Sequence, residues 1–174
     1  GHQISDALQP AVAGALAACN HNLWRVMRTP LAKLQPRHAV ARALAAKVGY
    51  LSCAELIDAW ALHWMSKDLD AADMATLVML FSTGALASVE RLRLDGSRLG
   101  PAGASALLAG LGGGDAPRLT RLNLYATGLG NEGAATIAAA LSHGALPKLK
   151  ELQVGFNGIG EEGLAALAGP LRQR

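Results

Sequence analysis

The chain has 174 residues, of which 51% are hydrophobic and only 4% aromatic, and its formal net charge is +3. This length corresponds to one domain and allows a substantial core. The longest uncharged stretches are residues 7–24, which polar residues interrupt, and residues 74–89, which are too few to cross a bilayer. We therefore expect no transmembrane helix, and the opening residues also lack the basic segment of a secretory signal.

The two cysteines, Cys19 and Cys53, both fall on apolar faces of predicted helices. Reduced, core-facing thiols are favoured over a disulfide, because a small free Cys behaves as a buried hydrophobe. The sequence therefore favours an intracellular, cytoplasmic protein, with an organelle as the open alternative.

Three helices are predicted in the first sixty residues, over 10–28, between Pro36 and Gly49, and from Ser52 onward. The third begins with Ser52 and Glu55 at the spacing of a capping box. The apolar positions expected to face a core are Val12, Leu16, Cys19, Leu23 and Val26, then Val40, Leu44 and Val48, then Leu56, Ile57 and Trp60. We expect residues 1–61 to form a helical cap.

From residue 62 onward the sequence repeats with a period of about thirty residues, which is typical of a solenoid, where no unit buries its apolar face alone. Each unit begins with two alternating apolar residues, followed by a third apolar residue and, in three units, a glycine. The recurring positions are Leu62, Trp64 and Leu69; Leu92, Leu94, Leu99 and Gly103; Leu122, Leu124, Leu129 and Gly133; and Leu152, Val154, Ile159 and Gly163.

Within each unit the sequence predicts a short strand and then a helix. Alternating apolar residues indicate a strand with one buried face. The helices are rich in Ala and Leu, and helix-start signals precede them, such as Asp70, Pro101 and Glu132. Strands stack about 4.8 Å apart and helices about 8–10 Å apart, so the array must curve with the strands on the inner side. Residues 61–65 remain open between a strand and the end of a helix.

The clearest unit, LQVGFNGIGEEGLAALAGPL, resembles the leucine-rich repeats of the ribonuclease-inhibitor-like class, whose pattern is L-x-L-x-x-N-x-L-G-x-x-G. The resemblance covers residues 92–174 and, more weakly, 62–91. The turn asparagine of the pattern appears only as Asn157. Its counterparts are Thr127, Ser97 and Lys67, and a lysine cannot accept a hydrogen bond, so we expect a less regular turn in the first unit.

The predicted fold class is therefore α/β, a leucine-rich-repeat solenoid arc with parallel strands on the concave side, helices on the convex side and an N-terminal α-helical cap. Residues 62–174 are expected to form about four thirty-residue units, the first degenerate and the last truncated. No comparable cap follows the last unit, which leaves self-association through that end as a further prediction.

Charge is concentrated near the N-terminus. Residues 1–61 contain six Lys/Arg and three Asp/Glu, whereas residues 62–174 contain ten of each. A basic patch free of acids comprises Arg25, Arg28, Lys33, Arg37, Arg42 and Lys47. A solvated helix face is the favoured interpretation, and the alternative is an electrostatic anchor for nucleic acid, anionic lipid or another anionic polymer.

No constellation of residues in the sequence indicates catalysis. The five histidines lack partners at metal-ligand spacing, and the glycine run at 112–114 lacks the Lys-Ser/Thr of a phosphate-binding loop. We therefore expect no enzyme activity, no metal and no cofactor.

The predicted function is protein binding by a scaffold or interaction module, through the concave strand face and the adjacent loops. Alternation places these residues on that face: His63, Met65, Arg91, Arg93, Asp95, Arg121, Asn123, Tyr125, Glu151 and Gln153. Regulation of a GTPase or of immune signalling is a further alternative that the family resemblance alone implies. The identity of the protein partner does not follow from the sequence.

Overall fold

The structure is a computed structural model that describes residues 39–50, 55–56, 59–111 and 114–172. The chain divides into two compact units, Gly1–Glu55 and Leu56–Arg174. The first predicted helix, 10–28, and both cysteines lie outside the described residues.

Within the first unit, residues 39–48 are helical, inside the bounds predicted for the second helix. Its buried side chains are Ala41, Leu44, Ala45 and Val48. The prediction for Val40 is wrong, because 47% of its surface is exposed. Alanines instead complete the buried stripe at a spacing of three and four residues.

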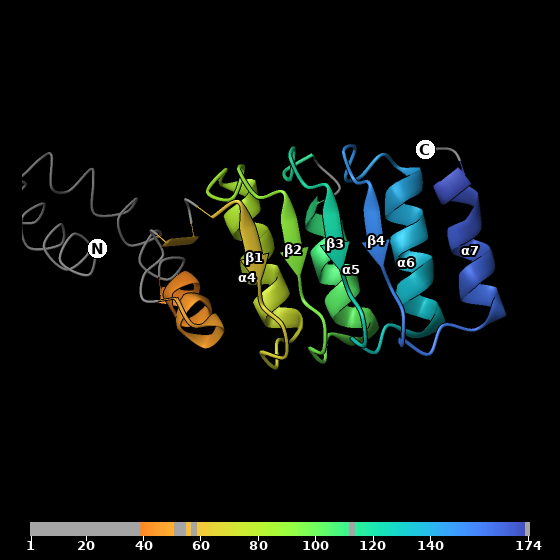
Figure 1. The fold of residues 1–174 in the computed structure, drawn as a ribbon, viewed down its shortest axis with the longest axis horizontal. Helices are drawn as coiled ribbons and strands as arrows, with labels where there is room; N and C mark the ends of the chain where they lie inside the picture. The colour runs from red at the N-terminus through yellow and green to blue at the C-terminus, as the bar shows by residue number, and fades with distance from the viewer. Residues whose placement is uncertain (1–38, 51–54, 57–58, 112–113, 173–174) are drawn as a thin grey trace, which may run out of the picture. The chain divides into compact units, whose positions relative to one another are not determined.

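The second compact unit, Leu56–Arg174, consists of four strand–helix pairs, here called repeats, that form one layer of strands and one layer of helices (Figure 1). Short strands alternate with helices of three to four turns. In chain order the elements are β1 Ala61–His63, α4 Ala71–Ser82, β2 Arg91–Arg93, α5 Gly100–Leu111, β3 Arg121–Asn123, α6 Gly130–Ser142, β4 Glu151–Gln153 and α7 Glu161–Arg172. The predicted arc of repeated α/β units is confirmed.

The sheet is parallel, with the strand order β1-β2-β3-β4. Leu62 is paired with Leu92, Leu92 with Leu122, and Leu122 with Leu152, which is the thirty-residue register of the sequence. Residues 61–63 are therefore a strand, which closes the question that the sequence left open.

The core lies between the sheet and the helices, and it becomes less buried in the last unit. In the second repeat, Leu92, Leu94 and Leu107 are fully buried. In the last unit Leu152 and Val154 are only half-buried. Each unit thus relies on the next for burial, as expected for a solenoid.

Helix α4 begins with the local chemistry that the sequence predicts. Asp70 accepts hydrogen bonds from the backbone N–H of Ala72 and Asp73, at 2.8 and 3.0 Å. Asp73 in turn accepts from the Asp70 backbone N–H at 3.0 Å, which completes a capping box. The first repeat, whose sequence is degenerate, therefore still has a helix start stabilised by side-chain capping.

The turns after the strands share a residue with positive φ, at Ser66, Gly96, Ala126 and Phe156. In the first three turns the backbone N–H of this residue donates to a carbonyl of the next repeat, as from Ser66 to Asp95 at 2.8 Å. Two residues further on, Asp68, Gly128 and Gly158 also have a positive φ at equivalent positions, and Arg98 in the second turn is the exception. These φ values therefore do not mark the first turn as the less regular one that the sequence predicts.

The turn asparagine acts on the preceding unit as well as on its own. Asn157 is buried, and its Oδ1 accepts from the backbone N–H of Thr127 at 2.8 Å and of Leu129 at 3.3 Å. Its Nδ2 donates to the carbonyls of Leu124 and Val154, at 2.7 and 2.8 Å. This side chain therefore joins the last two units.

The counterparts of Asn157 behave differently from one another. The Thr127 hydroxyl donates to the Leu124 carbonyl at 2.8 Å, as the sequence allows. The Ser97 hydroxyl is buried and makes no hydrogen bond to any of the described residues. Ser97 therefore occupies the position without stabilising the turn through a side-chain hydrogen bond.

Candidate functional site

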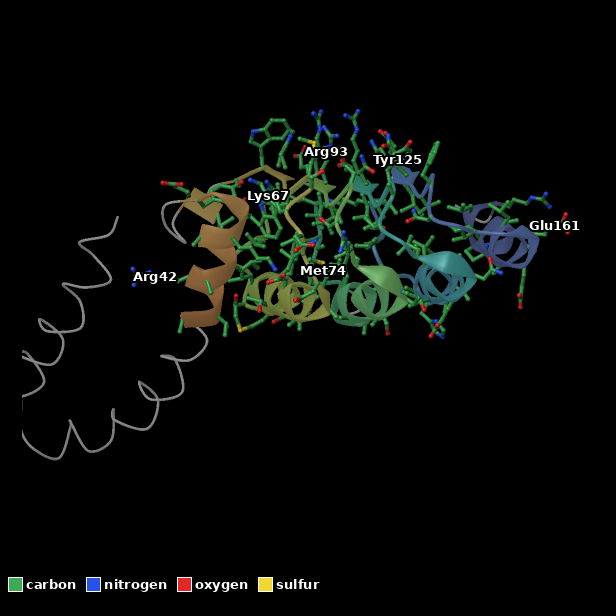
Figure 2. All side chains as sticks on the ribbon, turned by 90° about the horizontal axis from the view of Figure 1, so that it is seen from below. Arg42, Lys67, Met74, Arg93, Tyr125 and Glu161 are labelled. Atoms are coloured by element: carbon green, nitrogen blue, oxygen red, sulfur yellow. The ribbon has the colours of Figure 1, made fainter. Side chains whose placement is uncertain are left out.

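The strands present a continuous surface on the side away from the helices, which we call the strand face. The central strand residues Leu62, Leu92 and Leu122 are buried beneath it. Their neighbours point outward because side chains alternate along a strand. Figure 2 shows Arg93 and Tyr125 projecting from the strand layer, on the side away from the helix layer that contains Met74.

None of the ten residues predicted for the binding face is fully buried, and the sheet register aligns them in rows. Arg91, Arg93, Asp95 and Asn123 are half-buried, and the others, His63, Met65, Arg121, Tyr125, Glu151 and Gln153, are exposed. Arg91 is paired with Arg121, and Arg121 with Glu151, along the row at the start of the strands. His63, Arg93, Asn123 and Gln153 form the row at their ends.

Seven of these ten residues line one shallow cavity of about 360 Å³. Its base is formed by Leu92 and Leu122, and its walls are polar. The polar lining residues are His63, Arg91, Arg93, Arg121, Asn123, Glu151 and Gln153. Met65, Asp95 and Tyr125 lie outside this cavity.

Two of the three arginines in the cavity have carboxylate partners. Arg93 forms two hydrogen bonds to Asp95, from Nε and Nη2, each at 3.2 Å. Arg121 Nε lies 3.2 Å from Glu151 Oε2, and the other carboxylate oxygen of Glu151 accepts from Gln153 at 2.7 Å. Both ion pairs are partly exposed, so they orient the side chains more than they stabilise the fold.

The third arginine, Arg91, lies over the ring of Trp60, a residue that was expected on a helix. Its guanidinium carbon is 4.9 Å from the ring centroid of Trp60. Trp60 was predicted to sit on a helix stripe, and this is wrong: 56% of its surface is exposed, and it lies in a bend just before β1. The thirty-residue register already contained the signal, because it aligns Trp60 with the polar Glu90, Thr120 and Lys150.

An aromatic pair lies beyond the other end of the strands. The rings of Tyr125 and Phe156 are 5.1 Å apart between centroids, and their exposed fractions are 41% and 83%. Gly155 leaves room for the tyrosine, since a Cβ there would be 3.2 Å from its ring. Alternation along the strand did not predict Phe156, because it belongs to the turn.

The end of the array next to β4 also exposes apolar side chains. Leu164 and Leu171 of α7 are 56% and 47% exposed. A groove of about 420 Å³ beside β4 is lined by Leu149, Lys150, Glu151, Leu152 and Leu171. The predicted self-association would use this surface, and it stays a prediction.

Most of the predicted basic patch, namely Arg25, Arg28, Lys33 and Arg37, lies outside the described residues. Arg42 and Lys47 are exposed on the helix 39–48, in the compact unit Gly1–Glu55. The described residues thus contain two of the six members of the patch.

Neither a metal site nor a membrane span is found in the part of the chain that the structure describes. No three His, Cys, Asp or Glu residues among residues 39–50, 55–56, 59–111 and 114–172 come together as a metal site. None of the described helices is both long and apolar enough to cross a bilayer. The strand face is thus a surface of arginines, amides, two carboxylates and exposed aromatic rings.

A family model described as Leucine Rich repeat matches residues 145–168. No curated protein matches the chain. The matched segment includes β4 and the first two turns of α7, together with Asn157 between them. This match and the parallel repeat arrangement support a leucine-rich repeat protein, and domains of this kind are generally protein-interaction domains and typically non-catalytic.

Proposed function

We propose that the repeats are a non-enzymatic protein-interaction module of the ribonuclease-inhibitor-like class, which binds a protein partner through the strand face and the turns after the strands. One observation supports this most directly: three arginines and three exposed aromatic residues, Trp60, Tyr125 and Phe156, gather on one face, around a shallow cavity. Arginine, tyrosine and tryptophan are the residues that contribute most to protein–protein binding energy.

The size of the face indicates that the turns take part. A strand segment of four residues is about 13 Å long, and four strands at about 4.8 Å span about 20 Å, giving about 260 Å². A specific interface needs about 800 Å² on each partner. Phe156, in a turn and 83% exposed, extends the apolar surface in the required direction.

The interaction is tested by affinity capture from a cell lysate at low and at moderate salt. We expect a partner that persists at moderate salt and is lost on the double substitution Arg93→Ala/Tyr125→Ala. The matched control is Arg118→Ala, because Arg118 is exposed in the loop before β3 and lies outside the cavity lining.

A photo-crosslinking residue then locates the contact. Placed at Gln153, on the strand face, it should join the partner; placed at Ala135, exposed on α6, it should not. Crosslinking from Ala135 alone would contradict the proposed face.

The electrostatic anchor gives a different pattern in the same capture experiment. It predicts binding that falls steeply with salt and that Arg42→Ala/Lys47→Ala weakens, because each released counterion contributes to the salt dependence. The exposed positions of Arg42 and Lys47 are the observation in its favour. We propose that either interaction takes place inside the cell, because the sequence favours reduced thiols at Cys19 and Cys53.

A further inference from the structure

Arg91 differs from the other two arginines of the strand face in the group that its side chain contacts. Arg93 and Arg121 are paired with Asp95 and Glu151. Arg91 forms no ion pair with any of the described residues, and its guanidinium lies over the ring of Trp60. A guanidinium over an aromatic ring keeps its N–H groups, at the rim of the plane, available for a ligand.

The backbone around Trp60 gives this arrangement a fixed geometry. The Trp60 carbonyl accepts hydrogen bonds from the backbone N–H of Glu90, at 2.8 Å, and of Arg91, at 3.4 Å. The ring and the guanidinium therefore start from neighbouring, hydrogen-bonded strands. Less side-chain freedom is lost when a ligand binds to a group that is already oriented.

The row at the start of the strands has an unbalanced charge. Its members are Ala61, Arg91, Arg121 and Glu151, in the order of the sheet. Glu151 is paired with Arg121, on its neighbouring strand, and Ala61 on the other side offers Arg91 no charge. Arg91 is thus half-buried beside another arginine and forms no ion pair with any acid that the structure describes, in a cavity that remains open to solvent.

We infer that the strand face binds an extended acidic peptide, whose carboxylate group is held by Arg91 and whose apolar side chain packs on Tyr125 and Phe156. This inference rests on the proposed function and specifies the chemistry of the partner. A carboxylate forms two parallel hydrogen bonds to a guanidinium, which suits the free rim of Arg91.

The mixed charge of the face favours a peptide over a nucleic acid. Asp95 and Glu151 lie beside the other two arginines, and these acids repel a backbone that has a phosphate at every nucleotide. A peptide with a single acid matches Arg91, the arginine of the cavity lining that has no ion pair to the described residues. The amide of Gln153 on the cavity wall suits the polar groups of a peptide backbone.

The two contact points set the spacing within the peptide. Arg91 begins β2, and Tyr125 lies four residues after its partner Arg121, two residues beyond the end of β3. Four residues of strand are about 13 Å long and neighbouring strands about 4.8 Å apart, so the points are about 14 Å apart. An extended chain advances about 3.4 Å per residue, which puts the acid and the apolar residue about four positions apart.

The test uses immobilised pools of nonapeptides with two fixed positions, four residues apart. One position is Glu or Gln and the other is Phe or Ser, in all four combinations, with the remaining positions randomised. Retention of the fluorescently labelled protein is measured for each pool at moderate salt. We expect the Glu/Phe pool to retain at least about ten-fold more protein than the Gln/Phe pool, as for loss of a hydrogen-bonded charge.

The variants separate the two contacts. Arg91→Gln should abolish the preference for Glu over Gln and leave the preference for Phe over Ser. Tyr125→Ala should do the reverse, and Arg118→Gln, the matched control on an exposed arginine outside the cavity, should change neither. Circular dichroism of each variant confirms that it is folded.

Three outcomes would overturn the inference: no discrimination between Glu and Gln pools by the unmodified protein, a Glu preference that survives Arg91→Gln, or stronger competition by a ten-nucleotide single strand than by free Glu/Phe peptide. In each of these cases, crosslinking from Gln153 to a protein partner would still support the proposed function. Failure of that crosslinking, with the peptide preference intact, would instead count against the module as a binder of folded partners.

Discussion

At the scale of single residues, Asn157 makes the largest number of hydrogen bonds between two units. Replacing it with Ala would leave the Thr127 and Leu129 N–H groups without the side-chain acceptor that they share. The Leu124 carbonyl would lose one of its two donors and keep the Thr127 hydroxyl. Since each unsatisfied buried group costs about 1–3 kcal/mol, we expect Asn157→Ala to lower the free energy of unfolding by about 3 kcal/mol, measured by urea denaturation. Asn131→Ala is the control, because its Oδ1 accepts one exposed hydrogen bond from Gly160, and an equal loss would contradict this account.

The residue with positive φ after each strand offers a second test at this scale. Ala126 has φ 53°, in a region that costs an L-residue about 1–2 kcal/mol, whereas Gly96 occupies the same position with φ 72° at no such cost. We expect Ala126→Gly to raise the free energy of unfolding by about 0.5 kcal/mol, after the greater entropy of the unfolded chain is subtracted. Gly96→Ala should lower it by about 1 kcal/mol, because its new Cβ would also lie 2.7 Å from the Ser66 hydroxyl oxygen.

Both substitutions are compared by their urea midpoints at unchanged m-value. A loss of stability in Ala126→Gly as large as that in Gly96→Ala would show that strain at this position is not what distinguishes the units.

At the scale of elements, helix α5 lies close against helix α4 at Gly110. A Cβ added there would lie 1.8 Å from a methyl carbon of Val78. We expect Gly110→Ala to lower the free energy of unfolding by about 2–3 kcal/mol through overpacking, and Val78→Ala to restore part of this in the double variant. Thermal unfolding followed by circular dichroism measures all three.

The matched control for Gly110 is Gly169, in α7. Chain neighbours aside, nothing lies within 4 Å of a Cβ added there. The gain in helix propensity is offset by Pro170, whose ring disfavours a helical residue with a Cβ before it, so Gly169→Ala should change the free energy of unfolding by less than about 1 kcal/mol. If both substitutions destabilised the protein equally, the close approach of α4 and α5 would not explain the glycine.

The elements also show what the sequence could predict and where it stopped. The recurrence of Leu62, Leu92, Leu122 and Leu152 gave the strands and their exact partners, because a solenoid repeats its register with its sequence. Alternation along each strand then gave the exposed arginines. It did not give Trp60 or Phe156, which lie before and after the strands, where chain direction depends on local φ and not on a period of two.

At the scale of the whole repeat array, the last repeat departs from the two before it in its hydrogen bonds. Gly100 and Gly130 have positive φ and donate to carbonyls of the next unit, Thr127 and Asn157, each at 2.9 Å. Gly160 instead donates to the side chain of Asn131, in the preceding unit, at 2.8 Å. Helix α7 accordingly begins one residue later in the repeat than α5 and α6 do.

This asymmetry predicts a gradient of stability along the array, since each unit is stabilised mainly by its neighbours. The Leu124 and Ala126 N–H groups donate to Gln153 and Gly155 carbonyls at 2.8 and 2.9 Å, so their hydrogen exchange should be slow. Their counterparts Val154 and Phe156 have no such acceptor among the described residues and should exchange at least about a hundred-fold faster, as measured by NMR.

The same gradient should appear in the cost of truncating the central leucines. Leu122 is fully buried and packs between two neighbouring strands, so Leu122→Ala should cost about 3–4 kcal/mol. Leu152 is half-buried and has a neighbouring strand on one side among the described residues, so Leu152→Ala should cost about half as much. Equal costs in urea denaturation, together with protected Val154 and Phe156 amides, would mean that a further surface, such as that of a second copy, covers β4 in solution.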